Sequence, residues 1–482
     1  MLEKFKKKNT VKIGLAPTRR NLSRKNFFDK ADAKKEKDEI EKMLEEQNIE
    51  FVNLDFLNEE GIIHLGLDAE RAAQYFMEEK VDAIFAPHCN FGTEDAVARL
   101  AKMVGKPLLI WGPRDEAPLE DGSRLRDSQC GLFATSKVLK QFGIPFSYIP
   151  NCRLEDEVFR KGFQSFLGAA AVVKVLNGAR IGQIGTRPSA FWTVKFNEEE
   201  LIQKFGIEVV PLEIYDLKVM MNEILEQRYE EVKEVKEEIR VRIQEVEISE
   251  REFDEAVAMK LAIFDWAEVE QLSAAGMLCG KAARELFGIC PCFAMAELTD
   301  DGFPVACETD IHGAITGLMA QAAILGTGST FIADMTIRHP HNENAELLWH
   351  CGVFPYSMKK EGEQAKLNNH YGAGFPGTAQ WEIKGGDITL VRFDGADGKY
   401  QLLLAEGKGV EGPQNKGTWL WAEFRNWSEL ETRIIRGPYI HHCTGVYGHA
   451  AASLYEACRY IPELCPDAVF PTEQELERYL LS

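Results

Sequence analysis

The sequence lacks any apolar run close to the roughly 20 residues that a membrane-spanning helix needs. Its first ten residues, MLEKFKKKNT, are basic and lack the apolar core of a secretory signal. Basic residues are also in deficit, with 56 Lys and Arg against 76 Asp and Glu and a formal net charge of −20. These absences argue against a nucleic-acid partner and against an anionic membrane surface. We therefore expect a cytoplasmic protein with no membrane and no nucleic-acid partner.

The sequence also lacks cysteines at the spacing of a zinc site or a disulfide framework. Its eleven cysteines are scattered, mostly in apolar segments, which is typical of reduced and buried thiols. Cys290 and Cys292 are separated by one proline and have no second pair, so no structural zinc is expected. Gly182 and Gly185 give only a fragment of a GxGxxG turn, which makes a nucleotide site a weak hypothesis.

At 482 residues the chain is too long for one hydrophobic core, and its length is typical of about three domains. Residues 1–165 alternate short apolar strands with helices, as a doubly wound parallel sheet does. Residues 166–345 repeat this pattern as a second α/β domain that includes charged helices. In residues 346–482 the helical period fades and strands dominate. The predicted fold class is α/β, with two doubly wound parallel-sheet domains followed by a mostly β C-terminal domain.

Several segments carry specific expectations. Asp387–Phe393 and Lys399–Glu406 alternate as strands around the sequence Asp-Gly-Ala-Asp-Gly, which predicts a hairpin. Thr418–Phe424 and Thr432–Ile435 are expected to be further strands of the same domain. The apolar segment Ala275–Leu286 is expected to be a helix.

One stretch organises the chain. Phe303–Cys307 is an apolar strand candidate that ends on Glu308, and Ile311–Leu325 is long enough for four turns of helix. Thr330–Ala333 is a second strand candidate and ends on Asp334. A strand–helix–strand crossover predicts parallel strands, so both carboxylates should leave the same edge of one sheet, where open α/β sheets bind ligands. The alternative is that Glu308 caps the helix and Asp334 opens a loop.

Histidine is concentrated late in the chain, where eight of the ten follow residue 300. Together with Glu308 and Asp334 they could form a carboxylate–imidazole site for Mn²⁺, Co²⁺ or Mg²⁺. The adjacent pair His441 and His442 is the strongest candidate, although a single histidine is more often a core or surface residue than a ligand. In an extended strand the two rings point to opposite sides, so we expect at most one of them to face the site.

These motifs resemble those of a known family. The segments FPVACETD and STFIADMT look like the paired metal-carboxylate segment of the L-fucose isomerase / L-arabinose isomerase family, and HHCTGVYGH resembles its C-terminal histidine segment. LLWHCG, APTRR and HCNFGTED resemble further segments of the family. The stretch WGPRDEAPLEDGSRLRDSQCG is similar to a segment that is characteristic of a branch of the family with shorter chains.

The resemblance implies a cytoplasmic, Mn²⁺-dependent aldose–ketose isomerase. Such enzymes are homo-oligomers, commonly hexamers or other trimer-based assemblies, and form their active sites between subunits. Carried over by motif, Glu308 and Asp334 would be metal ligands and also the catalytic acid/base pair. His442 would be the third metal ligand from the protein.

The resemblance also implies contacts to the sugar. His441 would point away from the metal toward the substrate, and His350 would be either a ligand or a substrate contact. Gln271, in a helix ahead of the site, would meet sugar hydroxyls, and Arg19 would arrive from a neighbouring subunit. His441 stands where the fucose enzymes have Asn, which leaves the sugar open among L-fucose, L-arabinose, D-arabinose and similar aldoses.

The predicted function is a metal-dependent aldose–ketose isomerase that acts on a free, small-molecule sugar through an enediolate intermediate. One carboxylate would move the C2 proton and the other the hydroxyl proton. Two alternatives stay open. One is another metal-dependent sugar enzyme on the same fold, such as an epimerase or a lyase. The other is a non-catalytic sugar-binding protein, which the dense set of Glu, Asp and His residues argues against.

Overall fold

The computed structural model describes residues 9–20, 30–122, 124 and 126–482, and the chain divides into two compact units. The N-terminal unit comprises Thr10–Lys174, Tyr455–Ile461 and Gln474–Ser482. The main unit contains Val175–Leu454 and Pro462–Glu473, together with Asn9. The finer division into three domains, with boundaries after residues 165 and 345, stays a prediction.

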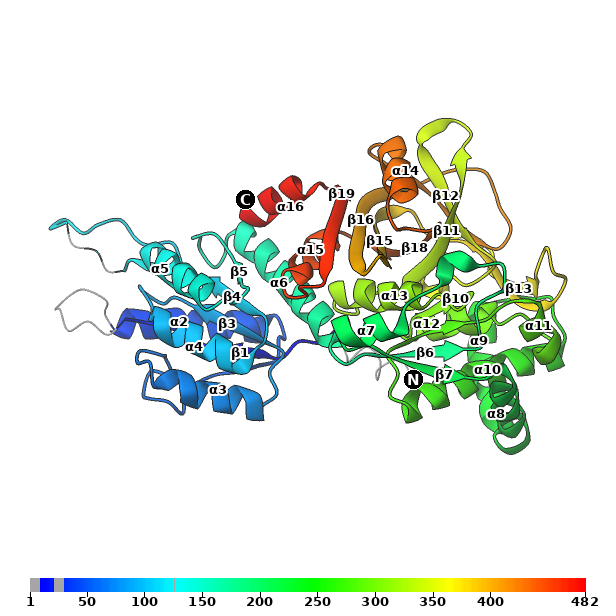
Figure 1. The fold of residues 1–482 in the computed structure, drawn as a ribbon, viewed down its shortest axis with the longest axis horizontal. Coiled ribbons are helices and arrows are strands. Elements are labelled where there is room, and N and C mark those ends of the chain that lie inside the picture. Colours follow the sequence, from blue (N-terminus) through cyan, green and yellow to red (C-terminus); the bar gives the residue numbers. More distant parts are fainter. Residues whose placement is uncertain (1–8, 21–29, 123, 125) are drawn as a thin grey trace. The chain divides into compact units, whose positions relative to one another are not determined.

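The N-terminal unit is built on a five-stranded parallel sheet in the order β2-β1-β3-β4-β5, as the alternating pattern predicted (Figure 1). Its strands are β1 (Ile13–Leu15), β2 (Phe51–Val52), β3 (Ala83–Pro87), β4 (Leu108–Trp111) and β5 (Ser147–Tyr148). Its helices are α2 (Lys30–Glu46), α3 (Asp68–Glu78), α4 (Glu94–Val104), α5 (Ser128–Gln141) and most of α6 (Glu157–Leu176).

Both faces of this sheet are covered. Phe159 of α6 packs edge-on against Trp111 of β4, with ring centroids 4.8 Å apart, and Phe163 lies 5.4 Å from Phe85 of β3. Ile84 and Ile110, which are next to these residues in their strands, belong to the cluster formed with α3 and α4. Strands that are buried on both faces read as continuous apolar runs, which explains why they were recognisable in the sequence.

The main unit begins with a four-stranded parallel sheet in the order β10-β9-β6-β7. Its strands are β6 (Arg180–Ile184), β7 (Glu208–Leu212), β9 (Ala274–Met277) and β10 (Val305–Cys307). The helices around it are α7 (Glu198–Phe205), α8 (Ile214–Gln227), α9 (Tyr229–Arg242), α10 (Glu250–Val269), α11 (Lys281–Phe287) and α12 (Cys292–Asp300). The helix expected over Ala275–Leu286 is confirmed only in its second half, which lies in α11, and is wrong in its first residues, which form the buried strand β9. Periodicity alone cannot separate a short buried strand from a helix.

A ten-stranded, mostly antiparallel sheet completes the main unit, in the order β19-β16-β15-β18-β11-β12-β17-β14-β13-β8. An additional pairing of β16 with β17 closes the six strands β16-β15-β18-β11-β12-β17 into a ring. The strands are β8 (Glu245–Val246), β11 (Thr330–His339), β12 (Asn342–His350), β13 (Lys366–Asn369), β14 (Pro376–Glu382), β15 (Gly386–Ala396), β16 (Lys399–Val410), β17 (Thr418–Phe424), β18 (His442–Tyr447) and β19 (Leu464–Phe470). An α/β region followed by a mostly β region therefore agrees with the predicted fold class.

Of two local predictions for this β region, a hairpin and a short strand, one is confirmed and the other is wrong. The hairpin is confirmed: β15 and β16 join at Asp397 and Gly398, whose positive φ values of 52° and 72° suit a type I′ turn. The strand expected over Thr432–Ile435 is wrong, because these residues lie in helix α14 (Trp427–Arg436). Asn426 caps that helix by accepting a hydrogen bond from the backbone of Glu429, and a cap outweighs a short β-branched pattern. The chain ends with α15 (Ala451–Cys458) and α16 (Glu473–Leu481).

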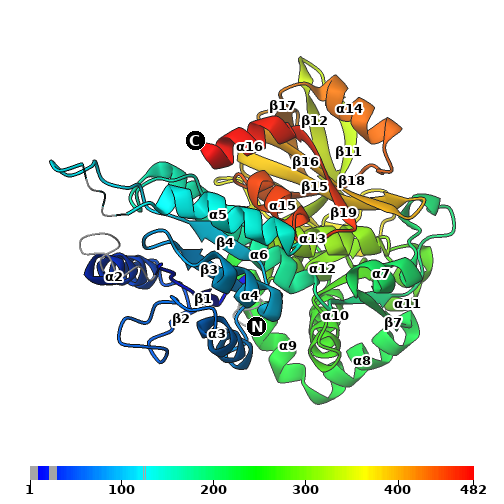
Figure 2. The same ribbon diagram turned by 60° about the vertical axis from the view of Figure 1, so that its left-hand side comes forward.

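Helix α13 (Ile311–Ala323) lies between the two sheets of the main unit and contacts β9 and β10 on one side and β15 and β18 on the other (Figures 1 and 2). All of its residues are buried, as expected of a helix that is apolar on every side. The crossover predicted from the sequence therefore exists, but it carries the chain from one sheet to the other. β11 is antiparallel to β12 and β18 and does not pair with β10, so the prediction of two parallel strands sharing one edge is wrong.

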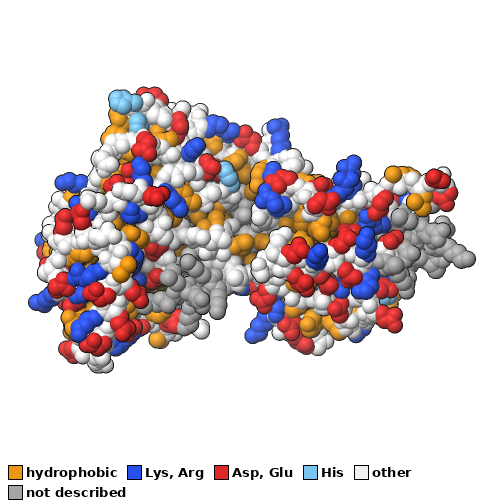
Figure 3. Space-filling view, turned by 180° about the vertical axis from the view of Figure 1, so that it is seen from behind, with side chains coloured by type: hydrophobic (Ala, Val, Ile, Leu, Met, Phe, Trp, Pro, Cys, Tyr) orange, Lys and Arg blue, Asp and Glu red, His pale blue; other side chains and the backbone are white. Residues whose placement is uncertain are grey.

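Among the described residues, no helix is both long and apolar enough to cross a membrane. On the face shown in Figure 3, acidic and basic side chains are interspersed over both units.

Candidate functional site

Glu308, Asp334 and His442 meet although they come from two different sheets. Glu308 follows β10, where it and Thr309 adopt left-handed backbone with φ of 61° and 58° and turn the chain toward α13. Asp334 lies in β11 directly opposite His442 of β18 in the strand register. Nε2 of His442 lies 3.2 Å from Oε2 of Glu308 and 3.3 Å from Oδ1 of Asp334. The structure thus brings together the three residues that the sequence proposed as ligands.

The ring of His442 is fully buried and held in one orientation. Its Nδ1 lies 2.9 Å from Oδ2 of Asp310, so the N–H at Nδ1 donates to this carboxylate. The opposite ring atom, Nε2, then points at Glu308 and Asp334. Burial lowers the pKa of His442, but the ion pairs with Asp310 and Glu308 and the charge of Asp334 raise it to about 10. The carboxylates of Asp310, Glu308 and Asp334 all contact this one imidazole, so negative charge exceeds positive charge around the ring.

A chain of buried charges extends from His442 into the core; we call Asp310, Arg392, Asp394 and His312 the buried ion chain. Nη2 of Arg392 lies 3.2 Å from Oδ1 of Asp310, and its Nε donates to Asp394 at 2.9 Å. Asp394 in turn lies 2.9 Å from Nδ1 of His312. Burial raises the pKa of Asp310 and of Asp394, but the charge of Arg392 outweighs it and holds both below their ordinary value.

Sequence reasoning missed the roles of these four residues. The one local signal was the position of Asp310, two residues after Glu308 in the segment CETD. Asp310 also caps α13 by accepting a hydrogen bond from the backbone of Gly313 at 2.9 Å. Its carboxylate thus fixes the start of the helix, the arginine and the histidine at once.

His441 faces the same carboxylate as His442. Its Nε2 lies 3.8 Å from Oδ1 of Asp334, and its ring centroid is 4.5 Å from that of His442. Asp334, His441 and His442 each offer a ligand atom within 4.8 Å of the others. The expectation that at most one ring faces the site is wrong, because His441 precedes β18 in a bend and is not part of the extended strand.

His350, at the end of β12, is buried and has its ring centroid 6.4 Å from that of His442. Its Nδ1 accepts a hydrogen bond from the backbone N–H of Cys351 at 2.9 Å, which places the ring hydrogen on Nε2. Burial lowers the pKa of His350, so the ring stays neutral. Of the two roles predicted for it, this tautomer favours a hydrogen-bond donor to substrate over a metal ligand.

Gln271 and Arg19 have different surroundings. Gln271 follows α10, with φ of 53°, and precedes β9, whereas Glu308 follows the parallel neighbour β10. It therefore lies at the opposite end of the sheet from Glu308. Arg19 belongs to the N-terminal unit, where it is 2% exposed and its Nε lies 2.6 Å from Oε2 of Glu60. That Arg19 contributes to the site of a neighbouring subunit stays a prediction.

The residues fit a divalent cation. Nε2 of His442, Nε2 of His350 and Oδ1 of Asp334 are among the buried side-chain atoms of the described residues that lack a properly aligned hydrogen-bond partner. Nε2 of His442 thus lies 3.2–3.3 Å from the carboxylate oxygens of Glu308 and Asp334 without being aligned for a hydrogen bond to either. Two carboxylates with one or two imidazoles are the donors that Mn²⁺, Co²⁺ and Mg²⁺ accept in proteins.

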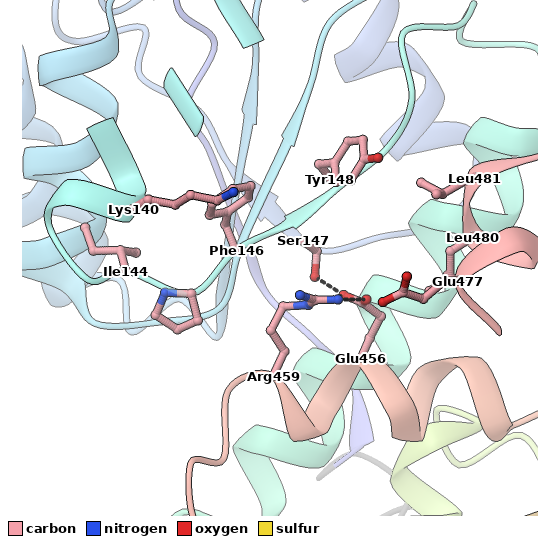
Figure 4. Close-up of a pocket in the computed structure, with 11 residues that line it drawn as sticks. Lys140, Ile144, Phe146, Ser147, Tyr148, Glu456, Arg459, Glu477, Leu480 and Leu481 are labelled. Carbon is pink, nitrogen blue, oxygen red and sulfur yellow. Dashed lines mark hydrogen bonds and ion pairs between the residues drawn. The ribbon is translucent and has the colours of Figure 1, made fainter. Parts of the chain in front are cut away.

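A separate pocket of about 400 Å³ lies in the N-terminal unit, beside β5 and the ends of α15 and α16 (Figure 4). Two of its charged groups, Glu456 and Arg459, pair with each other. Glu456 accepts a hydrogen bond from Ser147 at 2.6 Å and pairs with Arg459 at 3.0 Å. This pocket holds no cluster of the carboxylate–imidazole kind among its described lining residues.

Comparison with known proteins adds a family relationship. The model of the fucose/sulfoquinovose isomerase N-terminal domain matches residues 22–177, and that of the L-fucose isomerase C-terminal domain matches residues 348–463. His350, His441 and His442 lie inside the second match, and Glu308 and Asp334 lie between the two.

Three similar proteins bear the name sulfoquinovose isomerase. The protein from Priestia aryabhattai is 25% identical over 396 residues, covering 79% of this chain and 84% of its own. The protein from Alkalicoccus urumqiensis is 26% identical over 344 residues, covering 69% and 73%. The protein from Clostridium sp. (strain MSTE9) is 24% identical over 312 residues, covering 64% and 68%.

Proposed function

Since the chain belongs to the fucose isomerase-like family and is a sugar isomerase, we propose that it interconverts the aldose sulfoquinovose and its 2-ketose with the help of a divalent cation. Sulfoquinovose is a glucose in which a sulfonate replaces the hydroxyl at C6. The names of the relatives support this substrate over L-fucose, L-arabinose or D-arabinose. Because the chain is an enzyme, the alternative of a non-catalytic sugar-binding protein is set aside.

The observation that carries the proposal is the meeting of Glu308 and Asp334 at His442, within 3.3 Å of one ring nitrogen. Aldose–ketose isomerisation moves one hydrogen between C2 and C1 and another between O2 and O1, so two neighbouring carboxylates are suited to it. A cation such as Mn²⁺, held by Glu308, Asp334 and His442 with His441 beside them, supplies Lewis-acid polarisation of the sugar carbonyl when bound.

The chain's own residues then have distinct tasks. Burial raises the pKa of Glu308, but its contact with His442 and the charges of the neighbouring histidines lower it overall, so this carboxylate is ionised and able to act as a base. It takes the proton from C2 and returns it at C1, while Asp334 moves the hydroxyl proton. His350 donates from Nε2 to a sugar oxygen.

Product analysis tests this function. The protein is freed of metal with a chelator, loaded with Mn²⁺ and incubated with sulfoquinovose, and the products are identified by ¹³C NMR. We expect the signals of the 2-ketose with Mn²⁺ and none without it. L-Fucose, L-arabinose and D-arabinose serve as comparison substrates. A C2 epimer or two shorter fragments would instead identify an epimerase or a lyase, and turnover by metal-free protein would exclude the cation.

His442→Ala should weaken Mn²⁺ binding more than His441→Ala does. The ring of His442 is buried and aimed by Asp310, whereas the side chain of His441 is 44% exposed and lies 3.8 Å from Asp334. We expect His442→Ala to exceed the roughly 10- to 100-fold loss that removal of an outer partner causes. Isothermal titration of both variants with Mn²⁺ measures this, and the reverse order would make His441 the principal nitrogen ligand.

We also propose that the enzyme is a cytoplasmic homo-oligomer, a hexamer or another trimer-based assembly, with active sites between subunits. The support for this is the family resemblance of the sequence motifs. Sedimentation of the Mn²⁺-loaded protein under assay conditions checks the assembly, and an active monomer would contradict it.

A further inference from the structure

Two arginines at the carboxyl edge of the four-stranded sheet have no carboxylate partner among the described residues. Arg187 lies in the loop after β6, and Arg284 lies in α11, which follows β9. The neighbouring strand β10 ends at this same edge and leads into Glu308. Both arginines therefore belong to segments that leave the sheet at the same edge as the segment that carries Glu308.

The guanidinium of Arg187 is occupied by its own loop. Its Nη1 lies 3.1, 3.2 and 3.3 Å from the carbonyl oxygens of Pro188, Ser189 and Phe191. The ring of Phe191 in turn lies 6.5 Å from the ring of His441. These contacts give Arg187 the task of shaping the loop that packs beside His441.

Arg284 is less completely bonded. Its Nη1 donates to the carbonyl oxygen of Cys279 at 3.0 Å, whereas its Nε is buried without a partner in the described structure. The thiol of Cys279 lies 3.0 Å from that of Cys307, the residue before Glu308. Arg284 is thus linked through Cys279 and Cys307 to the backbone segment that carries Glu308.

His370 supplies a second donor in the same region: its backbone N–H and the thiol of Cys290, which follows α11 by three residues, both donate to the carbonyl oxygen of Phe375. Its Nδ1 accepts hydrogen bonds from the backbone N–H groups of Gly372 and Ala373, both at 3.1 Å, which places the ring hydrogen on Nε2. Burial, followed by the charges of Arg284 and His350, lowers the pKa of His370, so the ring is neutral. The next residue, Tyr371, has its ring 5.9 Å from that of Trp349, which precedes His350.

We propose that Arg284, with His370 as a second donor, binds the sulfonate of the sugar. This inference rests on the proposed function. A chain with a net charge of −20 repels an anion at long range, so its recognition needs a local cation. The sulfonate is at the far end of the sugar from C1 and C2, and Arg284 likewise follows the neighbouring strand β9 and not β10, which leads into Glu308. A planar guanidinium binds two oxygens of a tetrahedral anion at once, as it does with phosphate.

The experiment compares sulfoquinovose with 6-deoxyglucose, which lacks the sulfonate, on the Mn²⁺-loaded enzyme. We expect Arg284→Met to raise KM for sulfoquinovose about 10- to 100-fold, the worth of a charged hydrogen-bond partner, with a much smaller change in kcat. The preference for sulfoquinovose over 6-deoxyglucose should fall by the same factor, and Arg284→Lys should restore part of it. KM of the wild type should rise with salt, and that of Arg284→Met should rise less.

Arg187→Met is the comparison variant, because it removes the other arginine at this sheet edge, whose Nη1 is already bonded to its own loop and whose loss tests the effect of the loop beside His441. A normal KM and salt dependence in Arg284→Met would overturn the sulfonate site and leave the isomerase intact. If only Arg187→Met lost the preference for sulfoquinovose over 6-deoxyglucose, the sulfonate would be bound by the loop after β6 and not by Arg284, and the proposal would be overturned. A wild type that converts other aldoses but not sulfoquinovose would remove the proposed substrate and this site together. If Arg284→Met does not fold, Arg284→Gln and titration of the wild type with both sugars at rising salt decide the same question.

Discussion

Glu308→Gln should lower kcat by about 10²–10⁴-fold while Mn²⁺ remains bound, because that is the usual contribution of general acid–base catalysis. The amide keeps the shape and one donor oxygen of the side chain but cannot accept the C2 proton. Steady-state kinetics with sulfoquinovose measures the loss. Metal content must be determined in the same sample, since loss of the cation would also lower kcat.

Turnover in D₂O gives the complementary result for the wild type. A proton carried by a carboxylate exchanges with solvent, so deuterium should appear at C1 of the ketose. Complete transfer of the C2 hydrogen to C1, together with near-normal kcat in a metal-loaded Glu308→Gln variant, would indicate a hydride shift. Glu308 and Asp334 would then be ligands only.

Arg392→Met should destabilise the main unit by about 3–5 kcal/mol, the loss seen when one partner of a buried ion pair is removed. Arg392 is 1% exposed and is the one cation between Asp310 and Asp394 in the buried ion chain. Methionine fills most of the space but removes the guanidinium that both carboxylates share, so that Asp310 keeps only His442 and Asp394 keeps only His312 as a side-chain partner among the described residues. Urea unfolding followed by tryptophan fluorescence measures the change, because seven of the eight tryptophans lie in the main unit.

Arg433→Met is the control for this prediction. Arg433 pairs with Asp467 at 2.8 Å, but its side chain is 47% exposed, so its loss should cost no more than about 1 kcal/mol. An equal loss of stability in both variants would contradict the special role of the buried ion chain.

The loss of unfolding free energy in Arg392→Met should also depend on pH. In the wild type the pKa values of Asp310 and Asp394 are lowered, so their contribution to stability is present above the unfolded pKa of about 3.9 and is lost as pH falls through the folded values. Without Arg392, both pKa values rise from those in the wild type, because burial is then opposed only by the neighbouring histidines, and protonation relieves the variant. The difference in stability should therefore shrink between neutral pH and about pH 4, and a constant difference would argue against a role for the charges of these carboxylates.

The sequence predicted the parallel sheet of the N-terminal unit and the helix α13 because burial on both faces leaves continuous apolar runs. It failed at β11 because an apolar run that ends on Asp334 looks the same in a parallel and in an antiparallel sheet. The partners of β11 are set by the hairpin to β12 and by β18, more than 100 residues away along the chain. The grouping of Glu308 with Asp334 emerged nonetheless, because His442 lies opposite Asp334 in the register and reaches Glu308 as well.

The buried ion chain shows why the rest of the site was not predictable. Asp310 and Arg392 are 82 residues apart, as are His312 and Asp394, and nothing in the local sequence of either segment indicates its partner. His441 was misjudged for a smaller reason. The alternation rule holds only inside a strand, and β18 begins one residue later, at His442.

The position of α13 between the two sheets has a consequence for how the main unit folds. Glu308 and Asp310 belong to the segment that joins one sheet to α13, whereas His442 belongs to the other sheet, and the contact between Asp310 and His442 closes 132 residues of chain. Contacts of such long sequence separation form late, after local hairpins and helices. Neither sheet alone contains the complete cluster, so a partly folded chain has no paired carboxylates, and the capacity to move a proton arises only when the two sheets dock across α13.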